Sequence, residues 1–135
     1  MIKPIFLYCS TIHLAQNDTW IQKFESLQNR AKQIIGRHAS DFPSIQTERK
    51  RKISLHVFKI LHGIDAISTS ELELVNHSHN TRANKSTIKL PKIRTEAGRK
   101  TSSYQGAMVF NSLPLNVRSE IYFSNFKRFI KNHTF

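Results

Sequence analysis

The chain has 135 residues, of which 21 are Lys or Arg and nine are Asp or Glu, so its formal charge is +12. A compact protein with this charge repels itself unless a polyanion shares its field. Nucleic acid is therefore the favoured partner, ahead of an anionic membrane surface, and a solvated basic surface without a partner is the remaining interpretation. The single cysteine excludes an internal disulfide and a cysteine-based zinc finger.

The N-terminal part is expected to be helical. The first 15 residues are apolar, and periodicity alone does not decide between a strand and a buried helix. Residues 19–35 are the clearest helix, because Thr19 and Gln22 form a capping box and Gly36 stands at the position of a C-terminal cap. Apolar residues at spacings of three and four share one face of this helix: Trp20, Phe24, Leu27, Ala31 and Ile34.

Two basic features accompany the helices of this half. Lys23, Arg30 and Arg37 recur every seven residues, in a stripe that either follows a phosphate backbone or is a solvated flank. A second helix is expected over residues 47–62, with a stop at Gly63. Four cations in its first turns oppose the helix dipole and are more favourable against phosphate: Arg49, Lys50, Arg51 and Lys52. The apolar residues that follow must pack on another element: Ile53, Leu55, Val57, Phe58, Ile60 and Leu61.

The middle of the chain has the weakest pattern. Residues 64–80 include a short helix near residues 70–75 as one option. From residue 79 to residue 100 the chain is basic, and Pro91 and Gly98 argue against a helix. This stretch is expected to be an extended arm or a short β-pair.

Helical patterns return at the C-terminal end. Spacings of three and four predict a short helix over residues 103–113, ended by Pro114. The last element, residues 124–132, is amphipathic, with the cations Lys127, Arg128 and Lys131 on its outer side. Its inward residues are expected to be Phe126, Phe129 and Ile130.

These elements predict a mainly α fold of about four helices, with an extended basic arm or short β-pair at residues 79–100. The chain is interpreted as a single domain over residues 1–135. Its parts are a helical part at residues 1–63, the basic arm at residues 64–102 and a second helical part at residues 103–135.

The sequence predicts no catalytic residue, no metal site and no cofactor. No third group is positioned to activate the pair Cys9 and His13, so a buried thiol is favoured. His77 and His79 lack a third ligand at a recognisable spacing and are interpreted as loop histidines. Two-metal nucleotidyl transfer needs clustered carboxylates, whereas the aspartates are isolated in the sequence: Asp18, Asp41 and Asp65. The chain by itself is not expected to be an enzyme.

The cellular location of the protein is predicted from two signals that the sequence lacks. No segment approaches the roughly 20 apolar residues that a membrane span requires. The apolar stretch at residues 5–15 has no clean cleavage site for a signal peptide. The expected location is intracellular, in the nucleus or the cytoplasm.

Several short motifs occur in a fixed order along the chain. Residues 4–35 contain Y-C-S and then L-Q-N-R-A with I-I, residues 57–63 read VFKILHG, and residues 79–82 read HNTR. The C-terminal third adds P-K-I-R-T at 91–95, Y-Q-G-A at 104–107 and N-S-L-P at 111–114, followed by V-R at 117–118 and F-K at 126–127. In this order the set resembles the region that follows the polymerase core of non-LTR retrotransposon (LINE or jockey-like) reverse transcriptases.

The chain departs from the family pattern at three places. Two tryptophans of the family are His13 and Phe110 here, and the stretch between Ile35 and Glu48 looks shortened. The polymerase core with its Tyr-x-Asp-Asp loop is missing. We therefore expect a fragment that was separated from its catalytic core.

The resemblance implies a C-terminal, non-catalytic fragment of an RNA-directed DNA polymerase that contacts RNA or DNA through phosphates. The missing polymerase core is a second expected partner, and neither a small-molecule substrate nor a membrane is expected. Asn111 and Arg118 are expected to brace the local turn more than to contact nucleic acid. The alternative is a protein-docking module whose apolar second helix packs on the polymerase core. The predicted nucleic-acid contacts are Asn29, Arg30, Lys32, Arg82, Arg94, Arg99 and Lys100.

Overall fold

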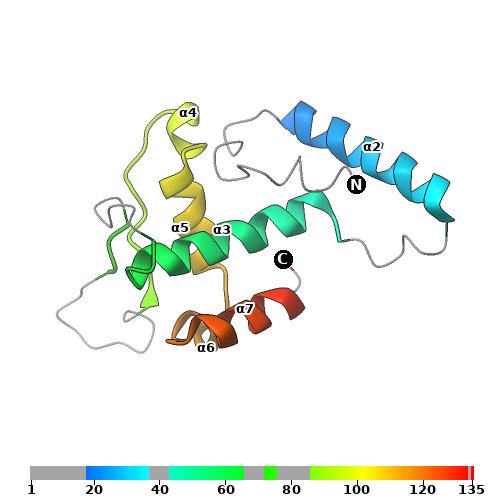
Figure 1. Cartoon of the computed structure of the whole chain (residues 1–135). Coiled ribbons are helices and arrows are strands. Elements are labelled where there is room, and N and C mark those ends of the chain that lie inside the picture. The colour runs from blue at the N-terminus through cyan, green and yellow to red at the C-terminus, as the bar shows by residue number, and fades with distance from the viewer. Residues whose placement is uncertain (1–17, 37–42, 66–71, 76–85, 134) are drawn as a thin grey trace.

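The computed structural model describes residues 18–36, 43–65, 72–75, 86–133 and 135, and every structural statement concerns these residues. They form six helices, without a strand among them: α2 (Asp18–Ile35), α3 (Ile45–Leu61), α4 (Glu96–Arg99), α5 (Ser102–Asn111), α6 (Leu115–Arg118) and α7 (Phe123–Asn132) (Figure 1). This confirms the prediction of a mainly α fold. The two helices beyond the expected four are the short α4 and α6.

The central helix is α3. It begins two residues earlier than predicted, because Ser44 caps it and accepts a hydrogen bond from the backbone N–H of Gln46 at 3.1 Å. It ends where predicted, since Gly63 has a φ of +63° and takes the left-handed conformation that glycine tolerates best. Ser44 follows Pro43 in a stretch whose sequence is typical of a loop, so the sequence pattern does not indicate this cap.

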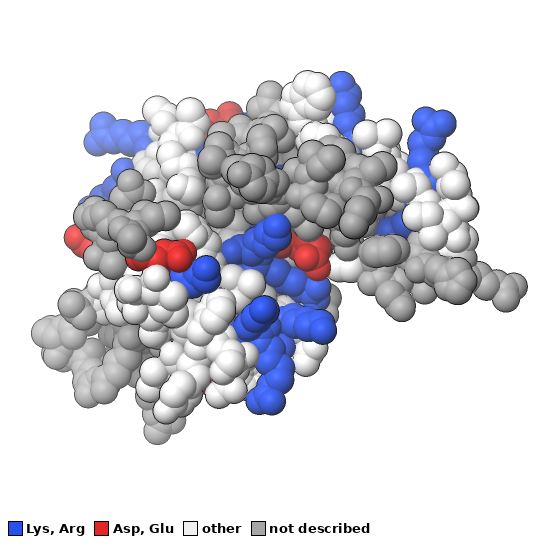
Figure 2. All heavy atoms as spheres, viewed as in Figure 1, with Lys and Arg blue, Asp and Glu red and all other residues white. Residues whose placement is uncertain are grey.

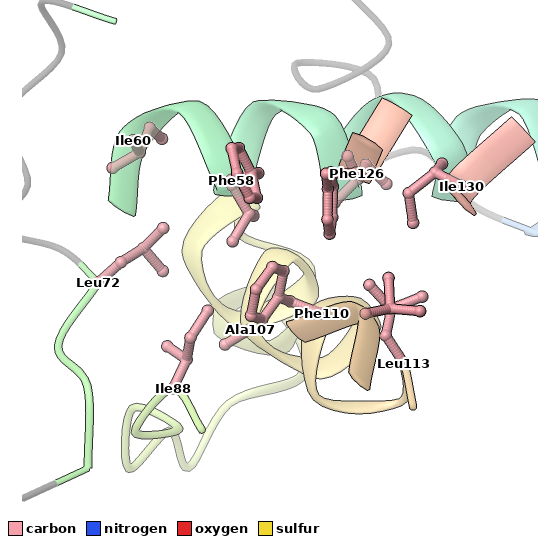
Figure 3. Packing of buried hydrophobic residues seen from close by; sticks show 12 residues of the cluster. Phe58, Ile60, Leu72, Ile88, Ala107, Phe110, Leu113, Phe126 and Ile130 are labelled. Carbon is pink, nitrogen blue, oxygen red and sulfur yellow. The ribbon is translucent and has the colours of Figure 1, made fainter. Parts of the chain in front are cut away.

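The core lies around α3. In Figure 1, α5 crosses α3 and α7 runs alongside it. The ring of Phe58 on α3 stacks on Phe126 of α7 with centroids 4.3 Å apart, and Phe110 of α5 lies 6.1 Å from Phe126 (Figure 3). Gly106 lets α5 approach α3 closely, since a Cβ there would lie 2.9 Å from a methyl group of Val57. The prediction that the apolar residues of α3 pack on another element is confirmed.

The last helix, α7, covers a second side of α3. Phe126 and Ile130 are fully buried, as predicted. Phe129 is 39% exposed, so its predicted inward position is wrong. Successive residues of a helix rotate by about 100°, which places Phe129 at the margin of the face centred on Phe126 and Ile130.

Two extended segments close the end of the core near the C-terminus of α3. The backbone N–H of Val75 donates to Thr87 O at 2.8 Å, and that of Lys89 donates to Glu73 O at 2.7 Å. These bonds flank a single antiparallel bridge between Leu74 and Ile88. The β-pair expected at residues 79–100 therefore exists as one bridge, and its partner segment lies outside that range.

The short helix considered near residues 70–75 is wrong for the described residues 72–75, which are extended. The local sequence alternates Glu and Leu from residue 71 to residue 74, and this period of two suits an extended segment. Leu72 is buried in the core, whereas Glu73 and Leu74 are exposed.

Gly98 does not prevent a helix, contrary to the expectation for residues 79–100. It lies within α4, where its backbone N–H donates to the side-chain oxygen of Thr95 at 3.2 Å. A Cβ on Gly98 would overlap the Cγ2 methyl group of Ile93. Glycine is therefore required by the close approach of residue 93.

The first described helix, α2, differs from α3 in how it packs. It begins at Asp18, so Thr19 lies inside the helix and does not cap it, whereas Gly36 ends it as predicted with a φ of +75°. Its attachment to the start of α3 includes two hydrogen bonds. The Gln28 amide donates to Pro43 O at 2.9 Å, and the Ser44 hydroxyl donates to the Glu25 carboxylate at 2.9 Å.

The predicted apolar face of α2 is only partly covered. Phe24 and Ala31 are half-buried, but the other three members of that face are exposed. The exposed fractions are 53% for Trp20, 54% for Leu27 and 87% for Ile34. The face that α2 turns towards the rest of the chain is rotated towards Gln28 and Glu25.

Candidate nucleic-acid interface

The predicted contacts on α2 are accessible. Asn29 and Arg30 are exposed, and Lys32 is half-buried. All three lie near the C-terminal end of α2, which is far from α4 in Figure 1. They therefore do not share one surface with the predicted contacts of the arm.

The predicted contacts of the arm are divided among different environments. Arg94 and Arg99 are exposed. Lys100 is half-buried, and its ammonium lies 3.2 Å from the carboxylate of Glu96. Arg82 lies outside the described residues. Six of the seven predicted contacts therefore lie in described residues. Three are on α2 and three are at residues 94–100, and these two groups lie apart.

A different set of cations is brought together by the packing of α7 against α3. These two helices carry eight Lys and Arg residues and a single acidic residue, Glu48. Figure 2 shows that Lys and Arg side chains gather over α3 and α7 on the face turned to the viewer. We call this surface the α3/α7 face and define it by Lys52, Lys59, Lys127, Arg128 and Lys131. Lys52 and Lys59 are half-buried, and the ammonium of Lys59 also lies 3.6 Å from the carboxylate of Asp65.

The two helices of the α3/α7 face run in opposite directions. Phe58, near the C-terminus of α3, stacks on Phe126 of α7, while Arg51, earlier in α3, donates to the carbonyl of His133 at 3.3 Å. The ammonium of Lys59 lies 5.8 Å from the ring centroid of Phe123. This contact places Lys59 beside the N-terminal end of α7.

Helical spacing places further cations beside the same seam. Lys127 and Lys131 follow Phe123 at intervals of four residues, and Lys52 precedes Lys59 by seven. Four residues make about one turn and seven make about two turns, so each pair forms a row along its helix. The rows flank the seam where α3 and α7 pack.

Arg51 has a structural role beside this face. Its guanidinium lies 3.0 Å from the Glu48 carboxylate and also holds the His133 carbonyl, with 21% of the side chain exposed. Burial lowers the pKa of Arg49, although a guanidinium still keeps its charge at neutral pH. The four cations at residues 49–52 therefore do not form one uniform contact surface.

The cations of α7 project from the outer side of the helix, as predicted. Lys127, Arg128 and Lys131 are exposed. At the start of α7, the carboxylate of Glu120 accepts hydrogen bonds from the backbone N–H groups of Ile121 and Tyr122 at 3.0 and 3.1 Å. The bond from Tyr122 is the main cause of the lowered pKa of Glu120, and the charge of Arg128 lowers it further.

Asn111 and Arg118 brace the fold. The side-chain oxygen of Asn111 accepts from Ile88 N at 2.9 Å, and its amide group donates to Ile88 O at 2.8 Å. Arg118 donates to the hydroxyl of Thr87 at 3.1 Å. Both side chains therefore hold residues 87–88, and not the local turn that they were expected to brace. Asn111 thereby occupies the edge of that segment opposite to residues 72–75.

The sequence contained the signals for both helices of the α3/α7 face but not their juxtaposition. The sequence shows both the basic run at residues 49–52 and the cations of α7. Neither the role of Arg51 nor the pairing of the two rows could be inferred, because both depend on the packing of residues about 70 positions apart.

No group of three or more His, Cys, Asp or Glu side chains within the described ranges could hold a metal ion. The helices of these ranges include none with both the length and the apolarity to cross a membrane. Comparison with protein-family models, with curated proteins and with solved structures finds no match.

Proposed function

We propose that the chain is a C-terminal, non-catalytic fragment of a retrotransposon RNA-directed DNA polymerase and that it contributes nucleic-acid contact through basic residues. The ordered motifs support the origin, and the formal charge of +12 supports a polyanionic partner. The observation that carries the contact is the α3/α7 face, where two helices distant in sequence place their cations together.

Contact through the α3/α7 face is electrostatic and independent of base sequence. Its defining residues are Lys and Arg, which bind phosphate oxygens. Each phosphate that is neutralised releases counterions, so affinity falls with salt by a slope of about 0.9 per contact on a duplex. A rigid pair of helices holds the cations in place before the nucleic acid binds.

The contact is tested by fluorescence anisotropy with a labelled RNA and a labelled DNA duplex over a range of salt concentrations. The triple variant Lys127→Gln, Arg128→Gln and Lys131→Gln removes the three exposed cations of α7. We expect weaker binding by about tenfold or more at low salt and a salt slope lower by about 2–3. A wild-type affinity that does not change with salt, or no binding at all, contradicts nucleic-acid contact.

A matched variant distinguishes the α3/α7 face from the predicted arm. Lys92→Gln, Arg94→Gln and Arg99→Gln also remove three exposed cations and the same net charge. If the arm variant loses as much affinity as the α7 variant, binding follows total charge and not the α3/α7 face. If only the arm variant loses affinity, the arm is the contact.

The origin of the chain has a separate test. The nucleotide sequence upstream of the codon for Met1 should contain a polymerase motif with paired aspartates, in frame or frameshifted. A long intact upstream sequence that encodes an unrelated protein contradicts the proposed origin.

A second proposed function is a docking module that packs on a polymerase core. The sequence suggests docking through the apolar surface of the second helix. In the structure, α5 and α7 cover this surface. The observation that favours docking is instead the exposure of Trp20, Leu27 and Ile34 on α2. Binding of the dye ANS and association that depends on concentration would support it, and a tight monomer that binds no ANS contradicts it.

A further inference from the structure

The exposed apolar residues of α2 form a single row. Trp20, Leu27 and Ile34 are spaced by seven residues, so they lie along one side of the helix about two turns apart. Each is more than half exposed. A period of seven keeps a row on one side of a helix, and such a row supplies one of the two apolar positions of a helix-pairing seam.

A second row, of cations, accompanies the first. Lys23 and Arg30 stand three residues after Trp20 and Leu27, and the ammonium of Lys23 lies 4.7 Å from the centroid of the Trp20 ring. Arg37 continues this spacing in the sequence but lies outside the described residues. Residues three apart are neighbours on a helix surface, so the cationic row flanks the apolar row directly.

The acidic side chain of α2 nearest to these rows points elsewhere. The Glu25 carboxylate accepts the hydroxyl hydrogen of Ser44, on the side of α2 that faces the rest of the chain. The exposed side of α2 therefore presents apolar residues with positive charge beside them.

The charge of the rows identifies the kind of partner. In paired helices the residues beside the apolar seam face each other, and opposite charges there select the partner. A second copy of this chain would bring its own Lys23 and Arg30 and a further charge of +12, which opposes self-association. A helix with acidic residues beside its apolar seam satisfies both rows.

We propose that α2 docks along Trp20, Leu27 and Ile34 onto a helix of another protein that carries an apolar heptad seam flanked by Asp or Glu. This inference gives the chemistry of the partner in the docking function proposed above and rests on that function. It does not depend on nucleic-acid contact, because the α3/α7 face uses other residues.

The chain carries its own reporter for this docking, since Trp20 is its only tryptophan. The full-length chain is titrated with a synthetic helical peptide that has a Leu and Ile heptad seam flanked by Glu. A second peptide has the same seam flanked by Lys. We expect the emission of Trp20 to shift to shorter wavelength and the Glu peptide to bind at least about tenfold more tightly at low salt.

Variants separate the seam from general hydrophobicity. Leu27→Asp should weaken binding of the Glu peptide by about tenfold or more, because a charge replaces the centre of the seam. Met108→Asp is the matched control, since Met108 is an exposed apolar residue of α5 with a similar exposed fraction. Its affinity for the peptide should equal that of the wild type.

Each contrary result has a defined meaning. Equal affinity for the Glu and Lys peptides, with ANS binding that Leu27→Asp abolishes, overturns the acidic partner but leaves docking by α2 intact. Absence of ANS binding together with absence of peptide binding overturns both. Dimerisation of the wild-type chain that Leu27→Asp abolishes shows that the occupant is a second copy, and overturns the inference. An equal loss of RNA binding in Leu27→Asp assigns the row to nucleic acid instead.

Discussion

The helices α2 and α3 resemble each other in length and in sequence pattern, but their surroundings differ. They contain 18 and 17 residues, each was predicted with an apolar face, and each ends at a glycine with positive φ. Phe58 of α3 is fully buried and stacks on Phe126 of α7, whereas Trp20 of α2 is half exposed. An amphipathic pattern therefore forms a helix in both cases, whereas burial of the apolar face depends on which other surfaces are available to cover that face.

The distribution of charge differs between the same regions. α2 has three Lys and Arg residues and two acidic residues, whereas α3 and α7 together have eight Lys and Arg residues and one acidic residue. Positive charge is therefore concentrated on the part of the molecule that also contains the core. Four exposed apolar side chains lie along α2, at Trp20, Leu27, Ile34 and Ile35. The proposed nucleic-acid contact and the proposed docking therefore use different surfaces of the chain.

The largest difference in stability between the two helices is expected when one aromatic residue in each is truncated. Phe58→Ala should lower the free energy of unfolding by about 3–5 kcal/mol, because it leaves a cavity beside Phe126 and Phe110. Trp20→Ala should change it by about 0.5 kcal/mol or less, as expected for a surface position. Urea denaturation followed by circular dichroism measures both. Equal losses would mean that α2 is packed as firmly as α3.

The next effect concerns how the extended segment is held to the core region. Asn111→Ala removes two hydrogen bonds to Ile88, whose side chain is buried, and should cost about 1–3 kcal/mol. Asn116→Ala, at an exposed position of α6, is the matched control and should be close to neutral. Hydrogen exchange at the amide of Ile88 should accelerate only in the first variant. Unchanged exchange in Asn111→Ala would show that the segment is held by its apolar contacts alone.

The glycines that end α2 and α3 allow the stability of the two helices to be compared a second time. Gly63→Ala and Gly36→Ala each place a Cβ on a residue with positive φ, and no atom lies within 4 Å of either Cβ. The backbone conformation alone should cost about 1–2 kcal/mol at each site. We expect Gly63→Ala to lower the global unfolding midpoint, because α3 is part of the core. Gly36→Ala should reduce helicity without moving that midpoint, and a shared shift of the midpoint would instead unite α2 with the core.

The smallest expected effect is a dependence on pH at the start of α7. The pKa of Glu120 is lowered from 4.5, first by the hydrogen bond from Tyr122. A lowered pKa means that the ionised form stabilises the fold at pH values above 4.5, and that this contribution is lost as the pH falls through the folded-state value. The difference in Tm between the wild type and Glu120→Gln should therefore be present at neutral pH and disappear in acid. A difference that is constant across this range would exclude the carboxylate as its source.

Local signals accounted for most helix ends. Gly36 and Gly63 were identified as caps, and Pro114 as a stop after the third predicted helix. The missed Ser44 cap and the misread Gly98 are also local features, but they compete with other signals nearby. A serine after Pro43 is typical of a loop as well as of a helix cap. Gly98 is usually a sign against a helix, but in α4 it is needed because Ile93 leaves no room for a side chain at that position.

The candidate site was predicted less well, for a different reason. The arm and α2 contain the predicted contacts Arg94, Arg99 and Arg30, and these lie on separate surfaces. The α3/α7 face joins cations that are about 70 residues apart in the chain. Periodicity describes one element at a time, so it cannot show which elements become neighbours.

The sequence by itself determined that this protein is basic and mainly helical, because charge follows from composition and helices follow from caps and spacings of three and four. Only the tertiary structure decided that α3 is buried and α2 exposed, that Asn111 braces Ile88, and that α3 and α7 share one basic face. The physical reason is range. A cap or a helical repeat acts over about four residues, whereas burial and shared surfaces depend on contacts between distant segments.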